Sequence, residues 1–229
     1  MSRDSKRFKE RLKLVDADKE YNLEEAVDVL KKLEPGKSDE SVEINFWLGL
    51  DSSKAEENIR GTVQLPNGSG KAVNVACICK GEQVKAAEEA GAEVVGGEDL
   101  VEKIQKGWLE FDVLVAHPEM MREVSKLGRV LGPKGLMPSP KAGTVAMDIG
   151  KAVKEIKKGK IEIKSDKTGG LHVACGKLSF PKEAIIENVR TVIKSVIDHR
   201  PSSAKGEYIK GIAVSATQGP GLKLEPSTN

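Results

Sequence analysis

Residues 73–79 read VNVACIC, and this nearly continuous apolar run decides the fold of the middle of the chain. A strand that is apolar on both faces is typical of a parallel sheet that helices cover on either side. Strand and helix patterns then alternate, which indicates right-handed β-α-β units in a small doubly wound sheet. The elements that we expect after the first strand are helices over residues 82–89, 99–106, 118–126 and 149–158, and strands over residues 93–95 and 111–116.

On both sides of this region the chain changes to a strict alternation of apolar and polar residues, as in strands with one buried face. The longest example is the run at residues 42–50. Amphipathic helices accompany these strands, one beginning after Asn22 at a capping position and one opened by Pro181. The pattern predicts an antiparallel α/β sandwich of the split β-α-β type, with further strands over residues 59–65, 160–164, 171–175 and 211–216.

The two hydrophobic patterns predict two domains in an α/β fold. Residues 1–67 and 160–229 would form the discontinuous sandwich, and residues 68–159 an inserted Rossmann-like domain with the parallel sheet. The chain crosses between the domains twice, and we expect a hinge at Pro66, Asn67, Gly68 and Gly159. Proteolysis should release a compact fragment near residues 68–159, whereas uniform digestion would count against this division.

The composition is that of a soluble globular protein, with 38% apolar and 31% charged residues. Only eight residues are aromatic, so the core must be aliphatic. No apolar run has the length of a membrane span, and the basic N-terminus lacks the apolar segment of a signal peptide. The three cysteines have no disulfide-framework spacing. We therefore expect a cytoplasmic protein that does not contact a membrane.

The sequence offers little enzyme chemistry. The three histidines are scattered, and none has a second ligand at metal-binding spacing. Cys77 and Cys79 share a face of a buried strand and read as packing residues. The turn before Lys71 lacks a P-loop glycine, because Leu65 stands in its place. We expect neither a cofactor nor a metal, and a small-molecule or nucleotide-binding enzyme built on the inserted domain is an alternative supported only by fold analogy.

The net charge is only +2, but the cations are unevenly placed. Residues 1–13 carry six cations against two acids, residues 122–141 five against one, and residues 151–167 seven against three. Basic clusters on an otherwise acidic chain suggest local contacts with polyanions, although solvated helix faces would explain any single cluster.

Residues 126–143, KLGRVLGPKGLMPSPKAG, form the most unusual of the basic stretches. Four glycines and three prolines argue against a helix or a central strand here. Four cations stand without an acid, while Val130, Leu131, Leu136 and Met137 can attach the loop to a core. The stretch is either a presented binding surface or an ordinary crossover loop with solvated lysines.

Residues 128–145, GRVLGPKGLMPSPKAGTV, resemble the signature of the bacterial large-subunit ribosomal protein L-one family. Residues 58–63, 91–97 and 166–169 support the resemblance, which covers essentially the whole chain. It implies a two-domain α/β fold and a place in the mobile stalk beside the tRNA exit site. It also implies that the split domain grips a kinked helical region of rRNA, that the same surface represses the protein's own messenger, and that the free protein is a monomer.

The resemblance also implies which residues act. Short polar side chains such as Thr217 suit ribose 2′-hydroxyls in a shallow minor groove, and Gly219 allows close backbone approach. The alternative, without an RNA-binding role, is a solvated strand end and a frayed tail. The residues expected to contact rRNA or messenger are Arg3, Lys6, Arg7, Lys37, Ser38, Ser41, Glu43, Lys167, Thr217, Gln218 and Gly219. Those expected to face the departing tRNA are Arg129, Lys134 and Lys141.

Two positions depart from the family pattern. The family usually has Phe where this chain has Ser38, and often Met where it has Gln218. Loss of both apolar contacts would weaken RNA binding by roughly 1–3 kcal/mol in total, unless new hydrogen bonds compensate.

The strand at residues 42–50 places Phe46 on its apolar face and leaves Trp47 alone on the other. Paired aromatics of the kind that read single-stranded RNA are therefore absent from it, and structured RNA recognised by shape fits better. A purely structural assembly protein is the third functional class that the sequence leaves open.

Overall fold

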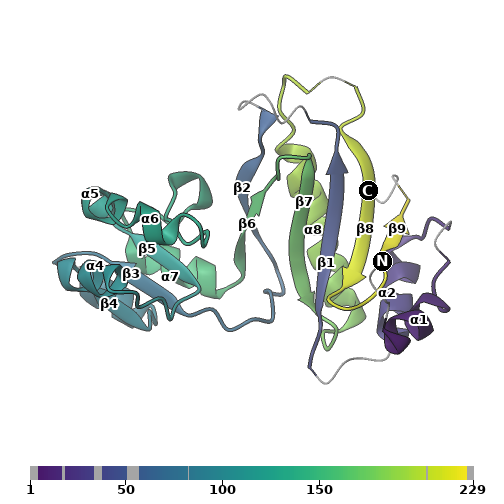
Figure 1. The fold of residues 1–229 in the computed structure, drawn as a ribbon, viewed down its shortest axis with the longest axis horizontal. Coiled ribbons are helices and arrows are strands. Elements are labelled where there is room, and N and C mark those ends of the chain that lie inside the picture. Colours follow the sequence, from purple (N-terminus) through teal and green to yellow (C-terminus); the bar gives the residue numbers. More distant parts are fainter. Residues whose placement is uncertain are drawn as a thin grey trace. The chain divides into compact units, whose positions relative to one another are not determined.

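The structure is a computed structural model, and it describes residues 5–16, 19–33, 38–50, 57–81, 83–204 and 206–225. The chain divides into two compact units (Figure 1). Unit 1 comprises Met1–Lys71 and Ile161–Asn229, and unit 2 comprises Ala72–Lys160. One unit has an antiparallel sheet and the other a parallel sheet, which confirms the mixed α/β class. That the units fold and move independently stays a prediction.

Unit 1 is built on a four-stranded antiparallel sheet with the order β7-β1-β8-β9. Its strands are β1 (Ser41–Leu48), β7 (Gly170–Lys177), β8 (Ile209–Ala216) and β9 (Leu222–Leu224). Alternate residues of β1 are buried, as the pattern predicts. The sequence did not reveal β9, because a three-residue strand carries no measurable periodicity and is defined only by its pairing with β8.

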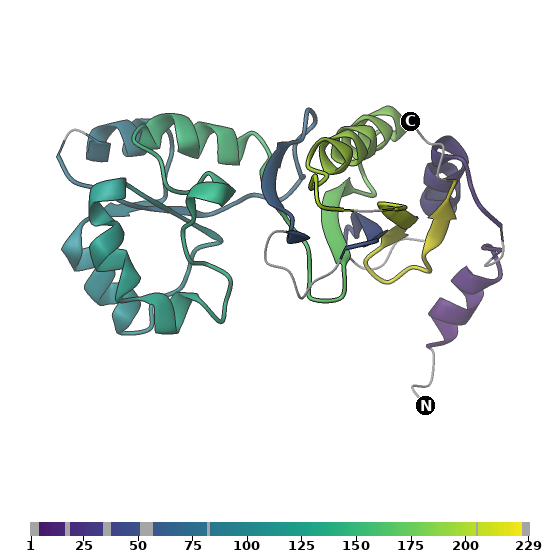
Figure 2. The same cartoon turned by 90° about the horizontal axis from the view of Figure 1, so that it is seen from above.

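Two helices pack against one face of this sheet, α2 (Leu23–Lys32) and α8 (Lys182–Asp198) (Figure 2). Asn22 caps α2 through its side chain, which accepts a hydrogen bond from the backbone N–H of Glu24. Pro181 precedes the first turn of α8. A short helix, α1 (Lys6–Leu12), lies near the N-terminus. The other face of the sheet keeps the polar residues of β1 accessible, and these supply the candidate site.

The strands β2 (Arg60–Gln64) and β6 (Lys160–Lys164) form a separate two-stranded sheet. Beyond β2, the backbone N–H of Asn67 donates to the Asn188 side chain of α8, at 3.1 Å, and that side chain donates to the Gly68 carbonyl, at 3.0 Å. These bonds attach Asn67 and Gly68 to unit 1. A hinge at this crossing would therefore act after Gly68, and the predicted hinge itself stays a prediction.

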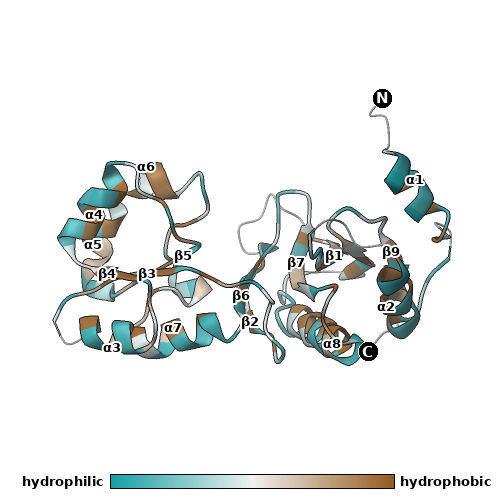
Figure 3. Ribbon diagram, turned by 90° about the horizontal axis from the view of Figure 1, so that it is seen from below, coloured by the Kyte–Doolittle hydropathy of each residue, from teal (hydrophilic) through white to brown (hydrophobic). Residues whose placement is uncertain are grey.

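Unit 2 has a parallel sheet with the order β4-β3-β5, formed by β3 (Val75–Ile78), β4 (Val94–Gly96) and β5 (Val113–Ala116). Alternate residues of β3 enter two different apolar clusters, Ala76 and Ile78 one, Val75 and Cys77 the other. Figure 3 shows β3 in brown at the centre of the unit. The helices around the sheet are α3 (Gln83–Glu89), α4 (Glu98–Gln105), η2 (Pro118–Met120), α5 (Met121–Ser125) and α7 (Ile149–Lys157).

The basic stretch at residues 126–143 contains a helix, so the prediction against one was wrong. The helix α6 (Gly128–Leu131) is followed by the 3₁₀ turn η3 (Pro140–Ala142). A single turn fits between Gly128 and Gly132 because the prolines come later, and the Gly132 N–H donates to the Gly128 carbonyl at 2.9 Å. Leu131 is fully buried, while Leu136 and Met137 pack partly buried against the same cluster. Leu131, Leu136 and Met137 therefore attach the stretch to the core as expected.

We predict that Leu131→Ala destabilises unit 2 by about 2–5 kcal/mol, because the side chain is fully buried and its loss leaves a cavity. Urea unfolding followed by circular dichroism measures this change. Lys134→Ala on the same stretch is the matched control, since its exposed side chain should contribute less than about 0.5 kcal/mol. Equal stability of the two variants would show that the stretch is not attached to the core.

The three cysteines are free and buried, in agreement with a packing role. Burial raises the pKa of the Cys77 and Cys175 thiols to about 12 and also raises the pKa of Cys79. At pH 8 the thiols therefore stay protonated and unreactive. We predict that iodoacetamide modifies none of them in the native protein within an hour and all three in denaturant, as mass spectrometry would show. Rapid native labelling would exclude this packing.

Candidate nucleic-acid interface

Polar groups from three strands meet at one end of the unit 1 sheet. Ser41 begins β1, Lys177 ends β7, and Thr217 follows β8. The Thr217 N–H donates to the Ser41 carbonyl at 3.0 Å, and the Ser41 N–H donates to the Thr217 hydroxyl at 3.0 Å. The Lys177 ammonium donates to the Ser41 hydroxyl at 2.9 Å. We call this set, together with Glu43, Gln218 and Gly219, the Ser41–Thr217 patch.

Small neighbours leave the patch accessible. Glu43 is half-buried and stands between Ala174 of β7 and Ser215 of β8 in the sheet. Its two neighbours are too short to cover the carboxylate. At the end of the patch, the Gly219 N–H donates to the Ala216 carbonyl at 2.9 Å and closes a turn. A Cβ at Gly219 would lie 3.3 Å from the Ala216 side chain, so glycine suits this tight turn.

A buried carboxylate connects the patch to the N-terminal helix. Glu40 is 3% exposed, and its oxygens accept hydrogen bonds from the Arg11 guanidinium at 3.0 and 2.6 Å and from Arg7 at 3.2 Å. The same carboxylate accepts the backbone N–H of Gln218 at 3.2 Å. Glu40 thus holds both α1 and the turn that begins with Thr217. Arg7, expected to contact RNA, points its guanidinium at this carboxylate.

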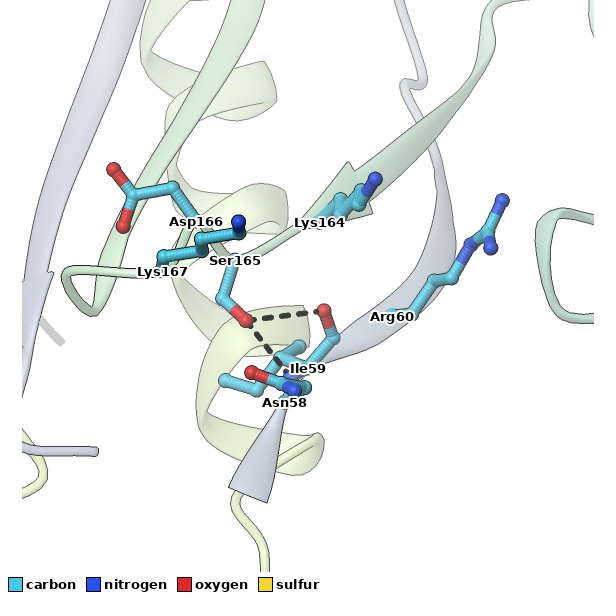
Figure 4. Close-up of a pocket in the computed structure, with 7 residues that line it drawn as sticks. All are labelled: Asn58, Ile59, Arg60, Lys164, Ser165, Asp166 and Lys167. Atoms are coloured by element: carbon cyan, nitrogen blue, oxygen red, sulfur yellow. Dashed lines mark hydrogen bonds between the residues drawn. The ribbon is translucent and has the colours of Figure 1, made fainter. Parts of the chain in front are cut away.

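A second polar region lies where β2 meets the turn between β6 and β7 (Figure 4). The Ser165 hydroxyl accepts the Ile59 N–H at 3.0 Å and donates to the Ile59 carbonyl at 3.4 Å, which joins the turn to β2. The pocket here has a volume of about 750 Å³, and its lining includes three cations, Arg60, Lys164 and Lys167, and the Asp166 carboxylate. The Arg60 guanidinium is paired with Glu162 at 2.6 Å, so Lys164 and Lys167 are the cations that suit a phosphate-bearing partner.

The turn of this region, residues 166–169, is held by its own acid. The Asp166 carboxylate accepts the backbone N–H groups of Thr168 and Gly170, both at 2.7 Å, and the Thr168 hydroxyl. These donors, the Thr168 hydroxyl first, lower the pKa of Asp166 below its ordinary value. Asp166 stays ionised at neutral pH, and the turn keeps its shape.

In unit 2, the three cations expected to face tRNA lie on the basic stretch. Arg129, Lys134 and Lys141 are all exposed. Within the described ranges none of the three has an ion pair, whereas Lys126 at the start of the stretch pairs with Glu123. The stretch therefore holds three uncompensated positive charges on a loop that Leu131 attaches to the core.

Residues 30–220 match the model of the ribosomal protein L1p/L10e family. The chain belongs to this family. It is also similar to a protein of Thermosipho melanesiensis described as large ribosomal subunit protein uL1, with 50% identity over 229 residues, which cover 100% of this chain and 99% of the relative. The resemblance found in the sequence is thereby confirmed.

Membership of the ribosomal protein L1p/L10e family gives the chain a structural, rRNA-binding role and excludes the alternative of an enzyme built on the inserted domain. It also places the chain in the cytoplasm, where bacterial ribosomes work. No cluster of potential metal ligands was found among the described residues. In the same part of the chain, no helix has the length and apolarity needed to cross a membrane.

The structure places the expected RNA-binding residues of this family member in different regions. Ser41, Glu43, Thr217, Gln218 and Gly219 come together in the patch. Ser38, just before β1 in the sequence, and Lys6 of α1, the helix that Glu40 holds, are both exposed. Lys167 belongs to the pocket at the far end of β1, roughly 20 Å along the strand from Ser41. Arg3 and Lys37 lie outside the described residues.

Sequence reasoning missed Lys177 and Glu40 as members of the interface. Lys177 ends the strand that pairs with β1, and the register that sets it opposite Ser41 includes a bulge after Val42. Glu40 precedes β1 and meets cations from a helix about thirty residues earlier. The available signal was the excess of cations in residues 1–13, which lacked an identified acidic partner.

Proposed function

We propose that this family member is a structural protein of the large ribosomal subunit that binds rRNA through the Ser41–Thr217 patch. The observation that carries the proposal is the pair of reciprocal backbone and hydroxyl bonds between Ser41 and Thr217, which fixes short polar groups at an accessible sheet end. Such groups suit ribose hydroxyls and backbone oxygens of a structured RNA. Phosphate contacts would come from Lys177, from Lys37 shortly before Ser41 in the sequence, and from Lys6 of α1, the helix that Glu40 holds.

Filter binding with purified large-subunit and small-subunit rRNA tests this function. We expect the intact chain to bind large-subunit rRNA at least about tenfold more tightly at one salt concentration, since phosphate attraction alone is common to both RNAs. Equal affinity for the two RNAs would remove the specific role and leave only nonspecific electrostatic binding.

We propose further that unit 2 forms the mobile part of a stalk and that Arg129, Lys134 and Lys141 attract departing tRNA. Their uncompensated charges support this role. Replacement of all three by glutamine should slow the departure of deacylated tRNA and reduce its salt dependence. A matched triple variant replaces Lys85 of α3, Lys103 of α4 and Lys106, which follows α4, by glutamine and removes the same charge elsewhere. Identical kinetics for the two variants would exclude the role.

The same patch is proposed to bind an element of the protein's own messenger and so repress translation, with the free protein a monomer. A surface fixed by Ser41 and Thr217 recognises any RNA with the same local shape. A messenger fragment should compete with large-subunit rRNA, and Thr217→Val should weaken both complexes by the same factor. Simultaneous binding of both RNAs would show that the surfaces differ.

Movement of unit 2 about the two crossings is the remaining part of the proposal. Asn67 and Gly68 are bonded to α8, so the flexible part of the first crossing would begin after Gly68. Limited proteolysis should release a compact fragment close to Ala72–Lys160, the extent of unit 2. Digestion that starts evenly along the chain would contradict two independent units.

A further inference from the structure

One large aromatic side chain lies on the open face of the unit 1 sheet without a packing role. Trp47 of β1 is 60% exposed, whereas its chain neighbours Phe46 and Leu48 are almost fully buried. In the sheet it stands between Gly170 of β7 and Gly211 of β8. Neither glycine has a side chain that could cover the indole, and a Cβ at Gly211 would meet nothing within 4 Å.

Cations and polar groups surround the indole. The Lys210 ammonium lies 5.4 Å from the centre of the Trp47 ring. The backbone N–H of Leu48 donates to the Gly169 carbonyl at 2.9 Å, so the turn that carries exposed Lys167 is bonded to the residue after Trp47. On the same face, Asn45 contacts the exposed His172 ring at 2.7 Å. The indole is thus an exposed aromatic surface with the Lys210 ammonium over its ring, and Lys167 belongs to the turn bonded next to it.

This environment distinguishes between possible occupants. An apolar protein partner would need apolar surroundings, but the residues around Trp47 are two glycines, Lys210, and the His172 and Asp166 side chains beside Gly170. Sites that stack a base and bind its phosphate typically have a cation close to an exposed aromatic ring. Trp47 also lies on the same face of β1 as Glu43 of the Ser41–Thr217 patch, so the two surfaces are continuous.

We propose that Trp47 stacks against an unpaired base of the RNA bound at the patch, with Lys210 and Lys167 holding the phosphates beside that base. The inference rests on the proposed rRNA-binding function. It adds a base contact roughly 20 Å along β1 from Ser41. It also differs from recognition by paired aromatics, because a single base, displaced from a structured RNA, suffices.

Tryptophan fluorescence tests the stacking directly. The chain has two tryptophans, so a Trp108→Phe variant leaves Trp47 as the sole emitter. We expect large-subunit rRNA to quench this emission on binding. In filter binding, Trp47→Leu should lower the rRNA affinity about tenfold, and Trp47→Phe should retain most of it. Neither substitution should change the thermal unfolding temperature of the protein, because the side chain is exposed.

Salt dependence separates the two parts of the proposed site. Lys210→Gln should reduce the slope of log affinity against log salt by about one, because one phosphate contact is lost. Trp47→Leu should leave that slope unchanged, since stacking releases no counterions. A reduced slope for Trp47→Leu would contradict the assignment of base stacking to the indole.

The outcomes also separate this inference from the proposed function. If rRNA binding leaves the Trp47 emission unchanged and Trp47→Leu binds rRNA with full affinity, the stacking site is excluded and the rRNA-binding function stands. If the wild-type chain does not bind large-subunit rRNA, the function itself fails. If sedimentation shows a dimer that Trp47→Leu dissociates, a second copy occupies the surface and the inference is overturned.

Discussion

Thr217→Val is expected to weaken binding to large-subunit rRNA about tenfold or more while leaving the fold intact. The substitution keeps the shape of the side chain and replaces its hydroxyl by a methyl group. That hydroxyl accepts the Ser41 N–H at 3.0 Å and lies 3.3 Å from the Ser41 carbonyl, to which it donates. The oxygen keeps a lone pair that can accept a ribose 2′-hydroxyl.

The expected magnitude follows from two losses in the complex. The ribose hydroxyl loses its acceptor, and the Ser41 N–H loses its partner in a place that the RNA shields from water. A buried polar group left unpaired costs about 1–3 kcal/mol, and about 1.4 kcal/mol corresponds to a tenfold change in affinity. In the free protein, water can reach the Ser41 N–H at this exposed position, so stability should change little.

A matched control is available on the opposite side of the sheet. The Thr191 hydroxyl donates to the Glu187 carbonyl on the exposed side of α8, at 2.8 Å. Thr191→Val makes the same chemical change away from the patch and should leave the rRNA dissociation constant unchanged. If both variants bind like wild type in filter binding at fixed salt, Thr217 is not part of the interface.

Glu40→Gln is expected to release α1 from unit 1 and to loosen the turn that carries Gln218. The glutamine has nearly the same size but no charge, and Arg11 is 3% exposed beside it. Removing one partner of a buried ion pair costs about 3–5 kcal/mol. Undocking of α1 returns the Arg11 guanidinium to water, which limits the loss of global stability. Trypsin should therefore cleave within Lys6–Leu12 at least about tenfold faster.

The effect of Glu40→Gln on RNA binding should be smaller than that of Thr217→Val, about three- to tenfold. The glutamine oxygen can still accept the Gln218 N–H, but the acceptor no longer carries a charge. Glu98→Gln provides the control, because its pair with Lys80 is exposed and should matter little. Unchanged proteolysis of Glu40→Gln would show that the carboxylate does not hold α1.

The hydrophobic periodicity predicted the long helices and strands well, because the burial of each of their residues follows its place in the period. The run at residues 73–79 predicted a strand covered on both faces, and β3 sends alternate residues into two clusters. The four-residue helix α6 and the three-residue strand β9 escaped prediction. Neither has enough residues for a period, and each depends on packing or pairing with distant chain.

The candidate site was harder to predict than the fold, since its contacts join distant residues. The bond between Lys177 and Ser41 spans 136 positions, and the bond between Gln218 and Glu40 spans 178. The sequence indicated Ser41, Thr217 and Gly219 only through the family resemblance. It gave no indication that the Thr217 hydroxyl is already bonded to the backbone of Ser41, which changes its capacity toward RNA from donor to acceptor.

The central claim is that short polar groups at the end of the unit 1 sheet recognise the ribose of a folded RNA. The most direct test compares the dissociation constants of the intact chain for a large-subunit rRNA fragment and for the same sequence as DNA, at one salt concentration. We predict that the RNA binds at least about tenfold more tightly, because only RNA offers the 2′-hydroxyl. Equal affinity for the two nucleic acids would contradict the account.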